Sequence, residues 1–545
     1  TAKAEHTLQW SGIDQYKIGG WGCRNIDRGN MYLMLMVLVL VLHLLLLPVY
    51  LYLTWHHRYW QRRGLITAKP LTVLGTYPGL LTRRSNLVLE VQRIYNQYKY
   101  KYRAVGVFVT RQPQILVLDP ALAHEVLVEN YCCYRDSLTS SYMKHATWEK
   151  YAGRNPFWAS GSDWRRLRSE AQAGLSSNRL KQGYAIWEES GKKLINFMAR
   201  EASKQQNIVE TRDLCFRYTA DVMCDFIWGI DAGTLSQHTD QPNKVQEMAS
   251  KWTNYVFHMI TIFMASIVAP ISRRLLRMRF YPKDTDEFFS NLTKASIDMR
   301  LNSGDNQRVD YLSYLLKLQG DKKHVSHDDL VGHALTVMLD GYDTTATALL
   351  HALYYLSGNA AAQQKLRTEI LRCLEENETC GFEQLSKLPY LEQVVYGNRF
   401  STAESLRLSS VVPQYTKVCT HDTTIKLNDF KSIDVEKGIT ILIPNYQFHH
   451  DAKYFPRPEA FHPERFDNGA HHEFIRKGML LPFSDGPRIC MGMRLALLTL
   501  KSALFHIISE YQVVRSKHRI TIAGTSGFGI VLNGDIKLEY RRLLK

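Results

Sequence analysis

The sequence has little of what marks a disulfide-stabilised or nucleic-acid-binding protein. Its nine cysteines are scattered over 545 residues, and none forms a Cys-x-x-Cys pair. This usage is typical of a reduced, cytosol-facing chain and argues against a disulfide scaffold. Lys and Arg outnumber Asp and Glu by 68 to 52, which favours negatively charged partners. Since no nucleic-acid-binding module occurs, we expect lipid and protein partners and no nucleic acid.

Linkers are also missing. No Gly/Ser-rich or Pro-rich stretch divides the chain after about residue 65, so one large domain is favoured despite the length. Most of the sequence has helical periodicity, and short β-rich runs occur towards both ends. We therefore predict a mainly α fold with small β-sheets. A long helix is predicted over Asp328–Leu356, and strands over Ala104–Val109 and Ile115–Leu118 are predicted to form a hairpin around Gln112-Pro113.

One long apolar run, Met31–Leu53, lies near the start of the chain. As a helix it can cross a hydrocarbon core of ~30 Å. Arg58, Arg62 and Arg63 follow it, so the positive-inside rule places the C-terminal side in the cytosol. A cleaved signal peptide is the alternative. The run is long for a signal peptide and no small-residue cleavage site is evident, so an uncleaved anchor is preferred.

These features divide the chain into four parts. The sequence begins with Thr1, and Met31 is the expected native start. We interpret the parts, in order, as a non-native extension, a transmembrane anchor, a basic linker and the main domain, over residues 1–30, 31–54, 55–70 and 71–545.

A decapeptide near the C-terminus, FSDGPRICMG, places one cysteine behind a glycine-bearing turn. A thiolate held in this way can be the axial ligand of haem iron, and Cys490 is the candidate. Gly486 lets the backbone approach a flat macrocycle, Arg488 offers a cationic fork to a haem propionate, and Phe483 can shield the sulfur from water. A buried structural cysteine is the alternative interpretation.

The predicted long helix contains Asp340-Gly341-Tyr342-Asp343-Thr344-Thr345. A glycine next to an acid–alcohol pair is unfavourable in the middle of a helix, and such conflicts often mark function. Gly341 would let a flat ring pack against the helix. Asp343 and Thr344 could deliver protons during the cleavage of dioxygen. A threonine that bonds to its own helix backbone is the alternative for Thr344.

The cysteine loop resembles the haem-binding signature of the cytochrome P450 family, Phe-x-x-Gly-x-Arg-x-Cys-x-Gly, at all five fixed positions. The helix motif is similar to the family's Ala/Gly-Gly-x-Asp/Glu-Thr-Thr/Ser, but Asp340 replaces the small first residue. Glu404 and Arg407 resemble the family's Glu-x-x-Arg pair, which an arginine of the Pro463–Phe466 stretch is expected to join. Their role is structural.

Trp164 and Arg168 fit the family's Trp-x-x-x-Arg, in which the arginine reaches a haem propionate. A basic surface helix is the alternative for this pair taken alone. The further propionate arginine that the family often has in a strand after Glu404 is missing, because Gln414 and Tyr415 occupy that area with Lys417 nearby.

The resemblance covers about residues 55–540 and is to the microsomal animal type, with an insect member as one option. It implies a single cytochrome P450 type domain behind an N-terminal transmembrane helix, with haem b (iron protoporphyrin IX) as cofactor. The implied reaction inserts one atom of O2 into a lipophilic small molecule. The implied partners are the lipid bilayer, NADPH–cytochrome P450 reductase and cytochrome b5. The implied location is the endoplasmic reticulum membrane, with the catalytic domain facing the cytosol.

One departure keeps alternatives open. Seven residues, 397–403, look inserted before Glu404, and Gly397-Asn398 would break or cap a helix there. A non-catalytic haem-binding or lipophile-binding membrane protein is therefore one alternative. A haem-thiolate isomerase that needs no O2 is another, and the intact Asp343-Thr344 pair argues against it.

Overall fold

The computed structural model describes residues 28–545 with gaps, and it divides the chain into two compact units, Thr1–Tyr52 and Leu53–Lys545. The residues left out of the description after residue 28 are 83, 144–148, 205, 237–242, 256–278, 304–307, 323–324, 378–379, 396–403, 517–520, 524–530, 534 and 544–545. The segment 397–403, which looks inserted in the sequence, therefore lies outside the described residues.

The described part of the first unit is formed by α1 (Arg28–Thr54), whose last two residues belong to the second unit. Its apolar side chains from Met31 onward are exposed, and Pro48 lies inside it without ending it. The stretch Met31–Arg62 is long and apolar enough to cross a membrane. The sequence prediction of an N-terminal apolar helix is confirmed.

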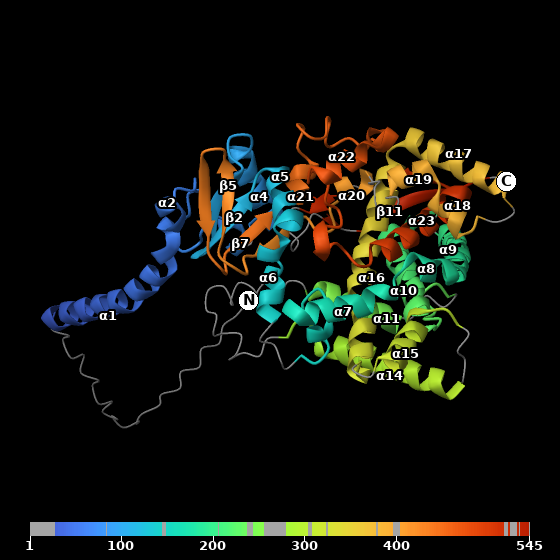
Figure 1. Ribbon diagram of the computed structural model, residues 1–545, viewed down its shortest axis with the longest axis horizontal. Helices are drawn as coiled ribbons and strands as arrows, with labels where there is room; N and C mark the ends of the chain where they lie inside the picture. Colours follow the sequence, from blue (N-terminus) through green and yellow to red (C-terminus); the bar gives the residue numbers. More distant parts are fainter. Residues whose placement is uncertain are drawn as a thin grey trace, which may run out of the picture. The chain divides into compact units, whose positions relative to one another are not determined.

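The second unit is mainly helical, and α16 (His327–Ser357) runs through its helical part (Figure 1). Helices α10 (Thr211–Trp228), α15 (Tyr311–Asp321) and α23 (Met493–Glu510) pack against it. The other helices of this part are α7 Gly161–Ala173, α8 Ser177–Gln182, α9 Ala185–Lys204, α11 Lys244–Asn254, α14 Lys283–Ser303, α17 Ala360–Glu376, α18 Phe382–Ser386, α19 Pro389–Val394 and α20 Glu404–Leu408.

A four-stranded sheet gathers segments from distant parts of the sequence. Its order is β1 (Ala104–Val109), β2 (Gln112–Val117), β7 (Thr440–Ile443) and β4 (Tyr415–Val418), with only β2 and β7 parallel. The remaining strands are β3 Ile208–Glu210, β5 Thr423–Asn428, β6 Lys431–Val435, β8 Tyr511–Arg515, β9 Thr521–Ala523, β10 Val531–Asn533 and β11 Lys537–Arg542. They form a β3-β11-β8 sheet and the pairs β5–β6 and β9–β10.

Further helices, most of them short, complete the described part of this unit. They are α2 Tyr59–Arg62, α3 Pro78–Leu81, α4 Leu87–Tyr98, α5 Pro120–His124, α6 Leu138–Met143, α21 Asn445–His449 and α22 Ala470–Arg476. Among them, α5 packs on β2 and α6 packs on β4. In Figure 1, β2, β5 and β7 lie together with α4 and α5, apart from the bundle around α16. The fold is thus mainly α with small sheets, as predicted.

Two predicted elements can be compared directly. The long helix is confirmed, with α16 extending one residue beyond the prediction at each end; Ser326 caps it in a capping box with Asp329. The hairpin also exists, but its turn lies at Thr110-Arg111 and not at Gln112-Pro113. Pro113 is tolerated in β2 because β7 pairs with β2 only from Gln114 onward.

Candidate active site

A tight loop presents Cys490 just before α23. The backbone N–H of Cys490 donates to the carbonyl of Phe483 at 3.0 Å, which closes the loop. Gly486 has a left-handed φ of +69°, and a Cβ built there would lie 2.1 Å from the carbonyl oxygen of Leu127. This position therefore requires glycine, both for its dihedral and for the close approach of a neighbouring backbone.

The Cys490 thiol has a mixed electrostatic environment. Burial raises its pKa, and the Asp340 carboxylate raises it further, whereas backbone N–H groups of Gly492 and Met493 and the charge of Arg168 lower it. The two amides belong to the first turn of α23, so the positive end of that helix faces the sulfur. Yet the Cys490 side chain is itself exposed. A sulfur that faces a space inside the protein would explain both the pKa raised by burial and the exposed side chain.

The middle of α16 faces the same space. Residues 330–339 and 345–353 of this helix are all buried. Between these two runs, four residues on one side of the helix are only partly buried: Asp340, Gly341, Asp343 and Thr344. Because the charge of Asp340 acts on Cys490, we infer that the centre of α16 and the cysteine loop lie on opposite sides of one internal space.

The residues of the helix motif have further contacts. The Thr344 hydroxyl donates to the carbonyl of Asp340 at 2.6 Å, a bond to its own helix. A Cβ at Gly341 would lie 3.3 Å from Cε of Met223, so this glycine also lets α10 pack closely on α16. The proton-delivery role of Asp343 and Thr344 and the ring-packing role of Gly341 stay predictions.

Three of the predicted cofactor-binding residues lie together beside the cysteine loop. The Trp164 ring lies 4.2 Å from the Arg488 guanidinium and 5.8 Å from that of Arg168. Arg168 donates to the carbonyl of Ile489 at 2.6 Å, next to the cysteine. Arg488 pairs with Asp136 at 3.1 Å. Partial burial lowers the pKa of both guanidinium groups, so this corner holds two partly buried cations.

Lys417 on β4 adds a third cation, which the sequence analysis left unassigned. Only 5% of its surface is exposed, and in the described part of the chain it has no ion-pair partner. Burial lowers its pKa to about 7, Arg488 and Arg168 lower it as well, and only Asp136 raises it. The only feature of the sequence that points to Lys417 is its position in the strand after Glu404, where the family often has a propionate arginine.

This corner therefore fits an anionic group. Arg168, Arg488 and Lys417 converge there, and among the described residues only Arg488 has a carboxylate partner, Asp136. A haem carries two propionates, which would balance the surplus positive charge. Cys490 supplies a sulfur donor, and the partly buried centre of α16 lies opposite it in the arrangement inferred above. The residues present thus fit a haem with a cysteine ligand.

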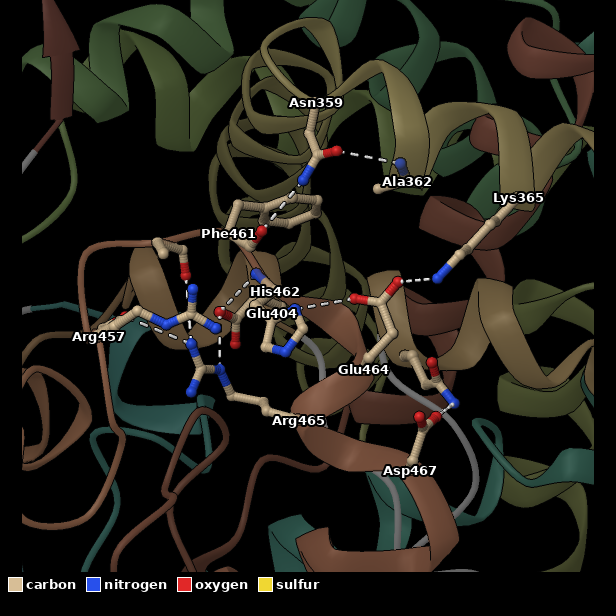
Figure 2. A network of polar contacts seen from close by, with 12 residues as sticks. Asn359, Ala362, Lys365, Glu404, Arg457, Phe461, His462, Glu464, Arg465 and Asp467 are labelled. Carbon is tan, nitrogen blue, oxygen red and sulfur yellow. Dashed lines mark hydrogen bonds and ion pairs between the residues drawn. The ribbon is translucent and has the colours of Figure 1, made fainter.

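A buried ion network joins α20 to the segment that contains His462 and Arg465 (Figure 2). Glu404, fully buried on α20, accepts two hydrogen bonds from Arg407, both at 2.8 Å, and one from Arg465 at 3.0 Å. The backbone N–H of His462 donates to the same carboxylate at 3.0 Å. The expected third member of the network, an arginine of the Pro463–Phe466 stretch, is confirmed as Arg465.

The segment that looks inserted does not separate the helices on either side of it. Helix α19 ends at Val394 and α20 begins at Glu404. The Ser405 hydroxyl donates to the carbonyl of Val394 at 2.8 Å, so the end of one helix contacts the start of the next. The Glu404 network is therefore complete on the far side of the insertion.

Comparison with known proteins agrees with this site. The family model described as "Cytochrome P450" matches residues 68–534. The chain is 67% identical to "Probable cytochrome P450 309a2" of Drosophila melanogaster over 98% of both chains. It is 47% identical to "Probable cytochrome P450 309a1" of the same species, over 91% of this chain and 96% of the relative. It is 29% identical to "Cytochrome P450 9e2" of Blattella germanica, over 90% and 95% respectively.

A mainly helical domain with this cysteine loop and cationic corner defines a haem-thiolate oxidoreductase. The chain belongs to the cytochrome P450 family and is a cytochrome P450 monooxygenase of insect type. Haem iron is the cofactor that this family implies.

Proposed function

We propose that this enzyme inserts one atom of O2 into a lipophilic small molecule, using electrons from NADPH. The observation that carries the proposal is the pairing of Cys490 with the partly exposed centre of α16 across one internal space. When bound, a haem with a thiolate ligand supplies the activation of dioxygen and favours O–O cleavage. We propose haem b as the cofactor and Cys490 as its only protein ligand.

The chain's own residues have separate tasks in this proposal. The N–H groups of Gly492 and Met493 stabilise negative charge on the Cys490 sulfur, as does Arg168. Arg168, Arg488, Lys417 and Trp164 hold the propionates and so fix the cofactor's orientation. Phe483 limits the access of water to the sulfur, and Gly486, in the same loop, lets the backbone approach the flat cofactor.

Proton supply is assigned to Asp343 and Thr344. The Thr344 hydroxyl is held in place by the hydrogen bond that it donates to the Asp340 carbonyl. The Thr344 oxygen can still accept a hydrogen bond from a proton donor through its lone pairs. We propose that the pair delivers protons to the reacting oxygen and excludes misplaced water. General acid–base help of this kind contributes about 10²–10⁴-fold.

The test uses the full chain with a reductase, and it measures product formed per NADPH consumed in Thr344→Ala and Thr344→Ser. Alanine should leave haem content unchanged while most of the NADPH consumed yields peroxide. Serine keeps the hydroxyl and should retain most of the coupling. Equal coupling in the wild type and in both variants would remove the proton-delivery role.

For electron supply, we propose NADPH–cytochrome P450 reductase, with cytochrome b5 as a second donor. Arg476, Lys477 and Arg494 are exposed near the cysteine loop in sequence and offer positive charge to an acidic partner. Arg494→Glu should raise the reductase concentration needed for half-maximal activity, and more so at low salt. An unchanged requirement would exclude docking through Arg494.

For location, we propose the endoplasmic reticulum membrane, with α1 as anchor and the catalytic domain in the cytosol. Residues 55–70, which the sequence predicts to be a linker, pack into that domain, since Trp60 and Leu65 are buried in its core. An apolar span holds far more strongly than a basic surface does. High salt should therefore leave the full chain in membranes, whereas a chain lacking residues 1–54 should become salt-extractable. Extraction of the full chain by salt alone would exclude the anchor.

A further inference from the structure

Asp340 carries a carboxyl group in the middle of α16, and the proposed function assigns no task to this group. It lies on the partly exposed side of α16, and its charge raises the pKa of Cys490. In the arrangement inferred above, this part of α16 borders the space in which a substrate of the proposed monooxygenase would lie. The flanking residues of α16 are buried, so this carboxyl is not part of a solvated helix surface.

The position of this carboxyl is fixed by a hydrogen bond from a buried asparagine. Asn155, which is fully buried, donates from Nδ2 to the Asp340 Oδ2 at 3.0 Å. The Asn155 Oδ1 accepts the N–H of Phe157 at 2.7 Å, which determines the orientation of the amide. Nδ2 also donates to the hydroxyl of buried Tyr281 at 3.2 Å. The second Asp340 oxygen, Oδ1, has no partner among the described residues.

We propose that Asp340 is a specificity-determining residue that selects lipophilic substrates carrying a cationic group. One oxygen is held by Asn155, and the other has no partner among the described residues, so an ammonium group would complete its coordination. A charge in such an apolar setting is costly unless it is paired, so a cationic substrate gains more there than a neutral one. This inference rests on the proposed function, because it assumes that the space beside Cys490 holds the substrate.

The titration of Asp340 gives the preference a pH dependence. Burial raises its pKa to about 7, against a smaller opposite effect from the Asn155 amide. Tyr281 and Cys490 are the titratable groups of neighbouring segments on which its charge acts. At pH 6 only about a tenth of the carboxyl is ionised, so cation binding should be about tenfold weaker at pH 6 than at pH 8.

The test compares two probes on the full-length, haem-loaded protein by calorimetry. One is a phenylbutyl trimethylammonium ion, which keeps its charge at every pH and cannot ligate iron. The other is the neutral hydrocarbon in which carbon replaces the nitrogen. The wild type should bind the cation about tenfold more tightly than the hydrocarbon at pH 8, and the hydrocarbon should show no pH dependence.

Asp340→Asn keeps an acceptor for Asn155 and removes the charge. It should abolish the preference for the cation and leave hydrocarbon binding unchanged. Glu149→Gln is the matched control, because burial also raises the pKa of Glu149 to about 7 and this group acts on the same Tyr281. It should retain both the preference and its pH dependence.

Equal binding of the two probes by the wild type would overturn the proposal, even if Asp340→Asn did not fold. So would a preference that persists in Asp340→Asn, or one that is lost in Glu149→Gln. Binding requires neither electrons nor O2. A protein that prefers the cation but forms no product would therefore contradict the proposed monooxygenation and leave the role of Asp340 intact.

Discussion

Replacing Glu404 by glutamine should be the most damaging single change in the network behind the site. The carboxylate has no exposed surface and balances Arg407, which has none either, as well as Arg465. Removing one partner of such a buried pair typically costs 3–5 kcal/mol, because the remaining charge is left without compensation. Since domains are stable by about 5–15 kcal/mol, this is a large fraction of the total.

Glu464→Gln is the matched control in the same network (Figure 2). Glu464 also pairs with a basic residue, Lys365 at 2.6 Å, but 57% of the Lys365 side chain is exposed. A pair of this kind contributes about 0.2–1 kcal/mol. Denaturant midpoints of the haem-loaded protein, followed by helical signal and haem absorbance, should therefore fall strongly for Glu404→Gln and little for Glu464→Gln. Equal midpoints for the two variants would refute the reasoning from burial.

Two further predictions concern the cationic corner and a buried acid. Lys417→Met should speed haem loss by roughly 10–100-fold, which corresponds to the loss of one charge-assisted hydrogen bond, whereas Lys417→Arg should retain haem. The rate of haem transfer to apomyoglobin measures haem loss in both variants. Equal transfer rates for Lys417→Met and the wild type would exclude a contact between Lys417 and a propionate. Burial raises the pKa of Glu149 from 4.5 to about 7. The unfolded state then binds fewer protons between these values, so stability should fall as the pH rises from 4.5 to about 7. Thermal unfolding of Glu149→Gln should show a shallower slope than the wild type, because Asp340, whose pKa burial also raises to about 7, keeps its own contribution. An unchanged slope in Glu149→Gln would contradict the assignment to Glu149.

Features written in contiguous sequence could be predicted. The cysteine loop, α16 and the apolar helix α1 each have a local signature of spacing or periodicity, and the structure has all three. The partner of Glu404 could be named because the stretch that contains Arg465 is itself a short motif. The predicted hairpin turn is wrong by two residues because proline is a common turn residue. Nothing local shows that β7 leaves Gln112 and Pro113 of β2 unpaired.

Other parts of the site depend on contacts between distant segments. Lys417 carries no motif, and its importance comes from burial beside Arg168 and Arg488. The hold of Asn155 on Asp340 joins residues that are 185 positions apart. Such pairs arise from packing, and no single-sequence pattern encodes them.

The central claim is that Cys490 is the protein ligand of a haem, and one spectrum tests it most directly. The full-length protein is reduced and exposed to carbon monoxide, and its Soret band is recorded for the wild type, Cys490→Ala and Cys490→His. We expect the red-shifted band of a thiolate ligand in the wild type only, with no such band for alanine and a globin-like spectrum for histidine. Retention of the red-shifted band in Cys490→Ala would contradict the account.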